Sequence, residues 1–167
     1  MSRVLVAGMG NVLRHDDGFG VEVARRLTET ALPANVTVVE VGIGGIHLVQ
    51  ELMDGYDALV VIDAVARGSA PGSIHLFEAD VPDLLSWPED ARGDFLADMH
   101  YTTPAKALVL ARALGVLPPR VYMLGCQPAE TDGLGLGLSA PVARAAAEAV
   151  TAIEDLARRL GLVPNGV

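Results

Sequence analysis

The residues of this chain best suited to catalysis or metal binding are three carboxylates and one imidazole. Asp16 and Asp17 are adjacent and follow the first apolar run. Asp63 directly ends another apolar run, and His100 lies just before a predicted helix start. Two carboxylates and one imidazole suit a borderline divalent ion with open coordination positions. Two neighbouring carboxylates could also share a proton, which is the chemistry of aspartic proteases.

Each carboxylate also has a structural interpretation. Asp63 could accept hydrogen bonds from the loop amides of residues 64–68, although buried carboxylates are rare unless they are paired, hydrogen-bonded or metal-bound. Asp17 could cap the helix predicted over residues 18–31, because Asp is favoured at that position. Asp16 could supply the cap instead and leave Asp17 free. The sequence alone leaves these alternatives open.

The remaining nucleophiles and imidazoles are interpreted as structural. Cys126 follows a strand and has no His nearby in the sequence, and a buried Cys is commonly inert. Ser139 is expected to cap the last helix. The other three imidazoles are expected to be surface residues or to have ordinary hydrogen-bond partners. They are His15 in the first loop, His47 on a helix and His75 facing outward on an edge strand.

The glycines before the acidic pair begin a dinucleotide-binding fingerprint without completing it. Gly8-Met-Gly10 is followed by Leu13 at the position where the third glycine is needed. Asp16 and Asp17 would repel a pyrophosphate at the start of the helix. We therefore expect no organic cofactor.

Hydrophobic patterning predicts the elements that position these side chains. Short apolar runs predict strands at 3–9, 36–41, 58–62, 74–77 and 120–125, and helical spacing predicts helices at 18–31, 46–56, 103–114 and from 139 onward. Alternating strands and helices indicate a parallel sheet with right-handed crossovers. The link before residue 74 is too short for a crossover, so that strand should be an antiparallel edge strand. Asp17 and Asp63 then lie at the carboxyl ends of parallel strands, where ligands bind.

Length and composition indicate one domain over residues 1–162, with a loose tail at 163–167. Apolar residues make up 51% of the chain, and no apolar run reaches the roughly 18 residues that span a membrane. A single Cys excludes an internal disulfide, and we expect a cytoplasmic location and no membrane. A formal net charge of −9 opposes nucleic-acid binding. The acidic segment 80–99 predicts short helical turns or a loop, and no role follows from it.

Several motifs, in chain order, resemble those of the hydrogenase maturation endopeptidases, which process the large subunit of nickel–iron hydrogenases. They are Gly8-Met-Gly-Asn11, Asp16-Asp-Gly18 with Gly20-Val21, Ile62-Asp-Ala64 followed by Pro71-Gly72, His100 before a helix, Gly125-Cys-Gln-Pro128 with Glu130, and Leu138-Ser139. The ordered set covers residues 3–155. Three features depart from the family pattern: His15 stands where family members often have an apolar residue or Gly, Glu130 is displaced by one residue, and segment 80–99 matches no family element.

This resemblance implies an α/β fold: a three-layer sandwich whose five-stranded, mostly parallel sheet has one antiparallel edge strand and helices on both faces. It implies an endopeptidase that removes a C-terminal extension from the nickel-loaded large-subunit precursor, its partner. Carried over by position, Asp17, Asp63 and His100 are the catalytic and metal-binding trio. Nickel would be recognised in the substrate, with Cd²⁺ or Zn²⁺ as possible surrogates.

Two other functions remain as alternatives. A non-catalytic nickel-sensing chaperone could use the same trio, and turnover of a precursor would distinguish it from a peptidase. Peptidyl-tRNA hydrolase also begins with a strand followed by a Gly-x-Gly-Asn motif, but the net charge of −9 opposes an RNA substrate.

Overall fold

The computed structural model describes residues 1–98 and 103–163, and its centre is one five-stranded sheet. The strand order is β2-β1-β3-β5-β4. The strands are β1 (Val4–Met9), β2 (Val36–Gly42), β3 (Ala58–Ala64), β4 (Ile74–Glu78) and β5 (Arg120–Cys126). Neighbouring strands are parallel except β4, which pairs antiparallel with β5 at the edge of the sheet. This confirms the predicted α/β class and the antiparallel edge strand.

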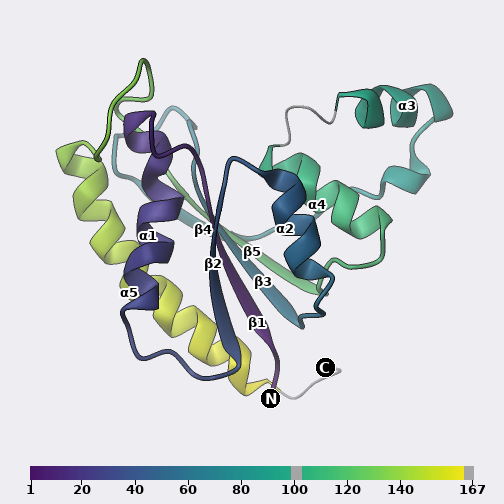
Figure 1. Cartoon of the computed structure of the whole chain (residues 1–167), viewed down its shortest axis with the longest axis horizontal. Helices are drawn as coiled ribbons and strands as arrows, with labels where there is room; N and C mark the ends of the chain where they lie inside the picture. Colours follow the sequence, from purple (N-terminus) through teal and green to yellow (C-terminus); the bar gives the residue numbers. More distant parts are fainter. Residues whose placement is uncertain (99–102, 164–167) are drawn as a thin grey trace.

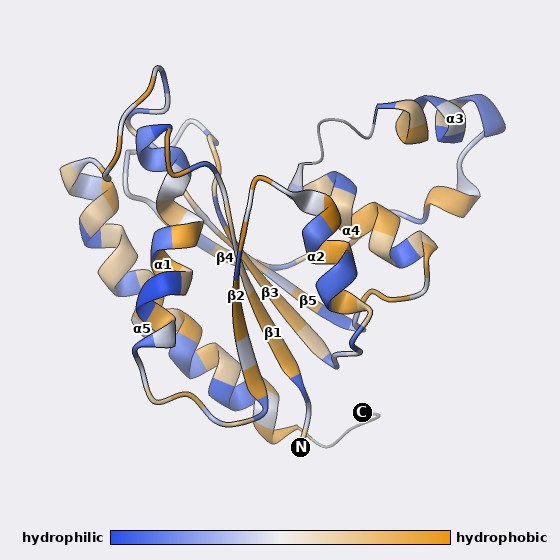
Figure 2. Ribbon diagram, in the orientation of Figure 1, coloured by the Kyte–Doolittle hydropathy of each residue, from blue (hydrophilic) through white to orange (hydrophobic). Residues whose placement is uncertain are grey.

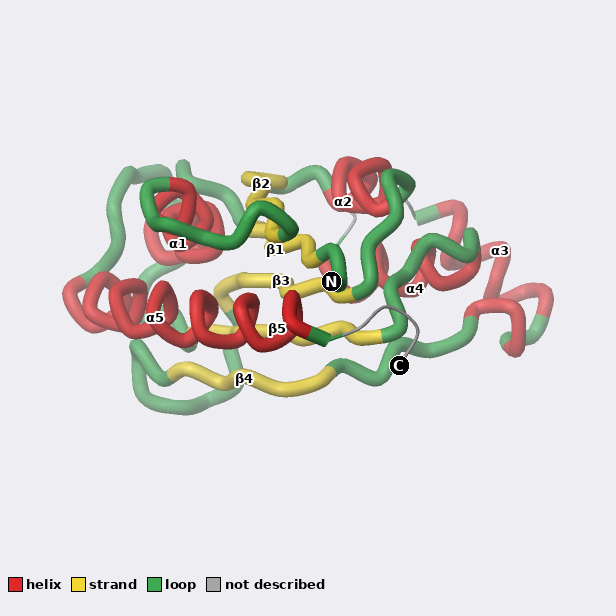
Figure 3. The backbone as a smooth tube through the Cα atoms, turned by 90° about the horizontal axis from the view of Figure 1, so that it is seen from below, coloured by secondary structure: helices red, strands yellow, loops and turns green. Residues whose placement is uncertain are grey.

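Helices cover both faces of the sheet and make three layers (Figures 1 and 3). The helices α1 (Phe19–Thr28) and α5 (Ala140–Leu162) lie on one face, and α2 (Gly45–Leu52) and α4 (Pro104–Ala113) lie on the other. The chain between β4 and α4 forms the 3-10 turn η2 (Leu84–Ser86) and α3 (Glu89–Ala97), which projects away from the sheet (Figure 1). No helix within the described ranges combines the length and apolar character needed to cross a bilayer.

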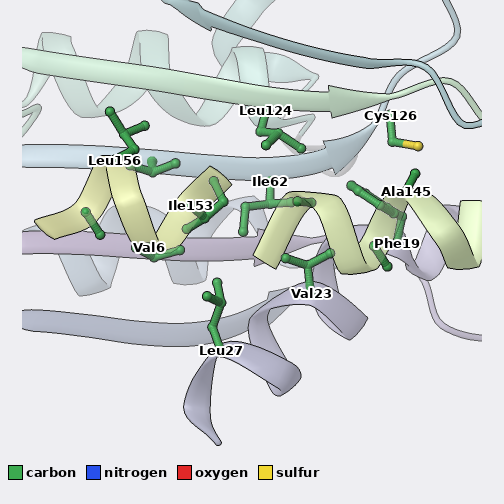
Figure 4. Packing of buried hydrophobic residues seen from close by; sticks show 14 of the residues in the cluster. Val6, Phe19, Val23, Leu27, Ile62, Leu124, Cys126, Ala145, Ile153 and Leu156 are labelled. Atoms are coloured by element: carbon green, nitrogen blue, oxygen red, sulfur yellow. The ribbon is translucent and has the colours of Figure 1, made fainter. Parts of the chain in front are cut away.

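The central strands are buried on both faces, which explains their continuous apolar sequences (Figure 2). On the α1–α5 face, Phe19, Ile62, Leu124 and Ile153 pack together (Figure 4). A second cluster on the opposite face joins β1 and β3 to α2 and α4. The two clusters hold the carboxyl ends of β1 and β3 side by side.

A close backbone contact holds the start of α1 against these strand ends. A Cβ atom at Gly20 would lie 2.1 Å from the carbonyl oxygen of Ile62 and 2.3 Å from that of Met9. Only glycine permits this approach. The 3-10 turn η1 (His15–Gly18), which immediately precedes α1, is thereby held over the carboxyl edge of the sheet.

Candidate active site

Asp17 and Asp63 line one cavity of about 350 Å³ at the carboxyl edge of the sheet. Asp17 lies in the loop after β1, and Asp63 lies near the end of the adjacent strand β3. Asn11 donates its backbone N–H to Oδ2 of Asp17 at 2.9 Å, which fixes the carboxylate in the loop. Neither Asp17 nor Asp16 caps α1, because its N-cap is Gly18 and has no side-chain hydrogen bond. The capping alternatives for both acids are therefore wrong.

Among the described residues, Asp63 accepts one hydrogen bond, from the next residue of β3. The backbone N–H of Ala64 donates to Oδ1 of Asp63 at 2.9 Å. Burial, and then the negative charge of Asp17, raise the pKa of Asp63 from 3.8 to about 7, against the opposing effect of the Ala64 N–H. The hydrogen bond from the backbone amide thus affects the pKa of Asp63 less than burial and the charge of Asp17 do. A carboxylate of raised pKa beside a second carboxylate suits a site that receives a cation or a proton.

Gly10 keeps the space between the two acids open. Its backbone φ is +127°, a conformation that side-chain-bearing residues rarely adopt. A Cβ atom at this position would lie 1.9 Å from the backbone oxygen of Asp17 and 3.6 Å from Oδ1 of Asp63. The second glycine of the Gly-x-Gly-Asn motif therefore shapes this cavity rather than a phosphate site.

Asp16 has a role that its sequence position did not reveal. Its side chain is fully buried and accepts hydrogen bonds from four donors. These donors are the backbone N–H groups of Ala129 at 2.8 Å, Glu130 at 2.9 Å and Ser139 at 2.7 Å, and the hydroxyl of Ser139 at 2.8 Å. Burial alone would raise the pKa of Asp16, but these donors hold it below its ordinary value.

Ser139 therefore differs from its predicted role. It occupies the N-cap position of α5, but its hydroxyl makes no capping hydrogen bond and donates to Asp16 instead. The physical reason is that a buried carboxylate needs hydrogen-bond donors. A hydrogen bond from the Ser139 hydroxyl to this charged group is stronger than one between the hydroxyl and a backbone N–H of the helix.

Further bonds join the first loop to the segment before α5. The backbone N–H of His15 donates to Gly135 O at 2.9 Å, and the N–H of Gly135 donates to Leu13 O at 2.9 Å. Arg14 donates from Nε to the carbonyl of Thr131 at 3.2 Å and also lines the Asp17–Asp63 cavity. The two segments thus hold the loop that carries Asp16 and Asp17, and Arg14 places a positive charge at the rim of the Asp17–Asp63 cavity.

The third predicted ligand, His100, lies outside the described residues. Thr103 and Pro104 line the cavity, and Thr103 caps α4 by accepting a hydrogen bond from the N–H of Lys106 at 3.3 Å. Over residues 1–98 and 103–163, no group of three His, Cys, Asp or Glu side chains is arranged to hold a metal ion. The trio of Asp17, Asp63 and His100 stays a prediction, of which the structure brings two members together.

The remaining candidates have ordinary structural environments. Cys126 is fully buried, and burial, followed by the charges of Asp16 and Glu148, raises its pKa to about 11, which suppresses the thiolate. His47 lies 3.1 Å from Glu51 on the exposed face of α2. These positions agree with the structural interpretations given to them.

His15 and His75 contact neighbouring loops. The ring of His15 packs against Gly135, where a Cβ atom would lie 1.9 Å from the imidazole, and its own backbone has a φ of 51°. Nε2 of His75 lies 3.2 Å from the hydroxyl of Ser69. Both imidazoles therefore help to order loops at this edge of the sheet.

Gln127 is a further structural residue that the sequence did not single out. Its Oε1 accepts the backbone N–H of Arg67 at 2.6 Å and lies 3.4 Å from the hydroxyl of Ser69. It thereby anchors the loop that follows Asp63. Its place between Cys126 and Pro128 of the Gly-x-x-Pro motif was the available signal.

Comparison with known proteins places this architecture in a family. The family model described as hydrogenase maturation protease matches residues 21–156, a range that includes Asp63 and begins after Asp17. The hydrogenase expression/formation protein HupD of Rhodobacter capsulatus is 39% identical over 143 residues, which is 84% of this chain and 64% of HupD. The chain therefore matches just under two thirds of that relative's length.

Solved structures agree in fold over nearly the whole chain. A hydrogenase 2 maturation peptidase from a Thaumarchaeota archaeon is 32% identical, with a TM-score of 0.69 over 95% of this chain and 99% of the peptidase. The hydrogenase maturating endopeptidase HybD of Escherichia coli is 25% identical, with a TM-score of 0.75 over 95% of this chain and 94% of HybD. This chain belongs to the hydrogenase maturation protease family.

Proposed function

We propose that this protein is an endopeptidase that removes a C-terminal extension from the precursor of a nickel–iron hydrogenase large subunit. The observation that carries the proposal is the pairing of Asp17 and Asp63 in one open cavity, within a chain of this family. A cleft with two carboxylates, one of raised pKa, suits hydrolysis of a peptide bond.

Nickel enters this proposal as part of the substrate. Asp17 and Asp63 supply oxygen donors, and His100 is expected to supply a nitrogen donor, which together suit nickel with positions left for its substrate ligands. Recognition of nickel would restrict cleavage to precursors that have received the metal. Cd²⁺ and Zn²⁺ are expected to bind the same donors as surrogates.

The acid–base step is assigned to Asp63. Its pKa of about 7 is close to neutral, where a general base is most effective, and within the described residues only Oδ1 accepts a hydrogen bond, so that Oδ2 is assigned the proton of the attacking water. Two ways of activating the attacking water are compatible with this arrangement of Asp17 and Asp63. In one, the carboxylate pair activates water by aspartic-type chemistry; in the other, substrate nickel acts as the Lewis acid and the carboxylates accept the proton.

The test is incubation of the purified protein with nickel-loaded and nickel-free large-subunit precursor, read by mass spectrometry. The expected result is that the wild-type protein removes a C-terminal fragment from the nickel-loaded precursor only. The variants Asp17→Asn and Asp63→Asn should leave both precursors uncleaved. Cleavage of both precursors would remove nickel recognition from the proposal. An uncleaved but tightly bound nickel-loaded precursor would favour the non-catalytic chaperone. The family match leaves no support for the peptidyl-tRNA hydrolase alternative.

A cytoplasmic location remains a prediction for this reaction. It agrees with a single, buried thiol and no need for an oxidising compartment. Fractionation of cells that express the protein would test it.

A further inference from the structure

A second cavity, of about 400 Å³, lies between α4, the β4–β5 edge and the segment that contains η2 and α3. We call it the apolar groove. Its main lining residues are Phe77, Val81, Trp87, Phe95, Leu108 and Met123. It includes part of the acidic segment 80–99, for which the sequence suggested no role.

The walls of the apolar groove are held by their own contacts. The rings of Trp87 and Phe95 meet edge to face, with centroids 5.6 Å apart and planes at 88°. Asp83 caps η2 by accepting the N–H of Leu85 at 3.0 Å, and Arg112 donates to the carbonyl of Val81. Phe77 remains 42% exposed in this arrangement. The groove is thus pre-formed and presents aromatic surface for binding.

The segment that forms one wall of the groove is acidic, whereas at the opposite wall the Arg67 guanidinium lies over the Phe77 ring, 5.4 Å from its centroid. Residues 80–98 contain six carboxylates and one arginine. Lys106, the basic residue among those that line the groove, has its ammonium 2.5 Å from Oδ2 of Asp98, and Asp80 is exposed at the rim. Figure 2 shows hydrophilic residues over the first part of α3 and apolar ones near its carboxyl end. This pattern complements an apolar anchor flanked by Lys or Arg.

The groove adjoins the candidate active site along a single helix. Thr103 and Pro104 line the Asp17–Asp63 cavity, whereas the next two residues, Ala105 and Lys106, line the apolar groove. Within the described residues, the groove and the Asp17–Asp63 cavity therefore both border the first turn of α4. A second copy of this chain is a poor occupant, because each copy carries a net charge of −9.

We propose that the apolar groove binds a segment of the large-subunit precursor in which an aliphatic or aromatic side chain is flanked by basic residues. Binding there directs the scissile region toward Asp17 and Asp63. This inference rests on the proposed function. It assigns recognition of the precursor's polypeptide to the apolar groove, whereas recognition of its nickel is assigned to Asp17, Asp63 and His100.

Trp87 is the only tryptophan in the chain, so its fluorescence reports directly on the groove. The probe is a short synthetic peptide of alternating Leu and Lys residues. It is compared with one in which Glu replaces Lys and one in which Ser replaces Leu. We expect the Leu–Lys peptide to change Trp87 emission saturably, more weakly at high salt, and the other two to bind about tenfold or more weakly. Equal binding of all three would overturn the proposal.

Two variants test the groove in the reaction. Ala105→Leu fills the groove with a side chain compatible with the helix, and Asp80→Lys reverses a charge at its rim. The matched controls, Ala147→Leu and Asp155→Lys, make the same changes on the exposed face of α5. We expect the groove variants to raise KM for the nickel-loaded precursor by about tenfold with little change in kcat, and the controls to match the wild type.

The outcomes separate this inference from the proposed function. Normal KM in Ala105→Leu and Asp80→Lys, with a cleaving wild type, would overturn the groove proposal alone. A wild type that cleaves no precursor would overturn the proposed function and this choice of occupant together. A concentration-dependent dimer that Ala105→Leu abolishes, measured by sedimentation, would assign the groove to a second copy and overturn the proposal.

Discussion

Asp17 and Asp63 share one cavity, and the charge of Asp17 adds to burial in raising the pKa of Asp63 to about 7. The relationship is set by the sheet, because Asp17 follows β1 and Asp63 lies near the carboxyl end of the adjacent parallel strand β3. Protonated and ionised forms of Asp63 are therefore both accessible near neutral pH. This places a proton acceptor of suitable strength beside a second carboxylate, and among residues 1–98 and 103–163 its hydrogen-bond partner is the Ala64 N–H.

Replacement of Asp63 by Asn should abolish precursor processing without loss of the fold. The folded-state pKa of Asp63 is raised from 3.8 to about 7, so wild-type stability falls as pH rises through this window. The amide does not ionise and avoids this loss. Above pH 7 we expect Asp63→Asn to be more stable by about 1 kcal/mol, or roughly 2–4 °C in Tm.

The two measurements, Tm against pH and cleavage by mass, belong on the same preparation. Retained cleavage would show that Asp63 serves only to hold its loop. A Tm difference that does not grow with pH would contradict the raised pKa.

Metal binding should require both acids and His100. We expect calorimetry to show weak Cd²⁺ binding at pH 8 that declines as pH falls below 7, because the ligands must lose their protons. Asp17→Asn and His100→Ala should each weaken binding by about tenfold or more. Asp155→Asn, on the exposed surface of α5, is the control. Unchanged binding in His100→Ala would remove that imidazole from the site.

Asp16→Asn should destabilise the protein and damage the site at a distance. The buried carboxylate accepts four hydrogen bonds, and an amide would direct an NH₂ group at donors. We expect a loss of about 2–4 kcal/mol, because hydrogen bonds to buried charges are among the strongest. Ser139→Ala removes only the hydroxyl donor and should cost about 1 kcal/mol. Equal Tm values for the two variants, from thermal unfolding, would contradict this account of Asp16.

Cys126→Ser should leave processing unchanged. The thiol is buried, its pKa is raised to about 11, and it donates weakly to the Gln127 carbonyl at 3.7 Å. The serine hydroxyl can make the same bond, so we expect a cost of no more than about 1–2 kcal/mol. A folded but inactive variant would require a cysteine mechanism in place of the one proposed.

The sequence predicted most of the architecture because each element carries a local signal. The buried strands β1 and β3 are continuous apolar runs, and Thr103-Pro104 begins α4 as such a pair usually does. Asp63 was also identifiable, since a carboxylate at the end of a buried strand has few structural explanations.

The environments of Asp16 and Ser139 could not be predicted in the same way. Their hydrogen bonds join residues 123 positions apart, and no local pattern reports such a contact. Both residues had plausible roles as helix caps, and the long-range bond between them replaced those roles. The apolar groove was equally hidden, because Phe77, Trp87 and Leu108 come from three separate elements.

The bonds of Asp16 also have a consequence for the order in which the parts of the molecule can come together during synthesis. Donors to this carboxylate are supplied by Ala129, Glu130 and Ser139, all made more than a hundred residues after it. A nascent chain that has released β1 to β3 from the ribosome already contains Asp17 and Asp63, but it lacks the donors that hold their loop. We therefore expect the loop that carries Asp16 and Asp17 to reach its final arrangement only after residues 129–139 have been synthesised.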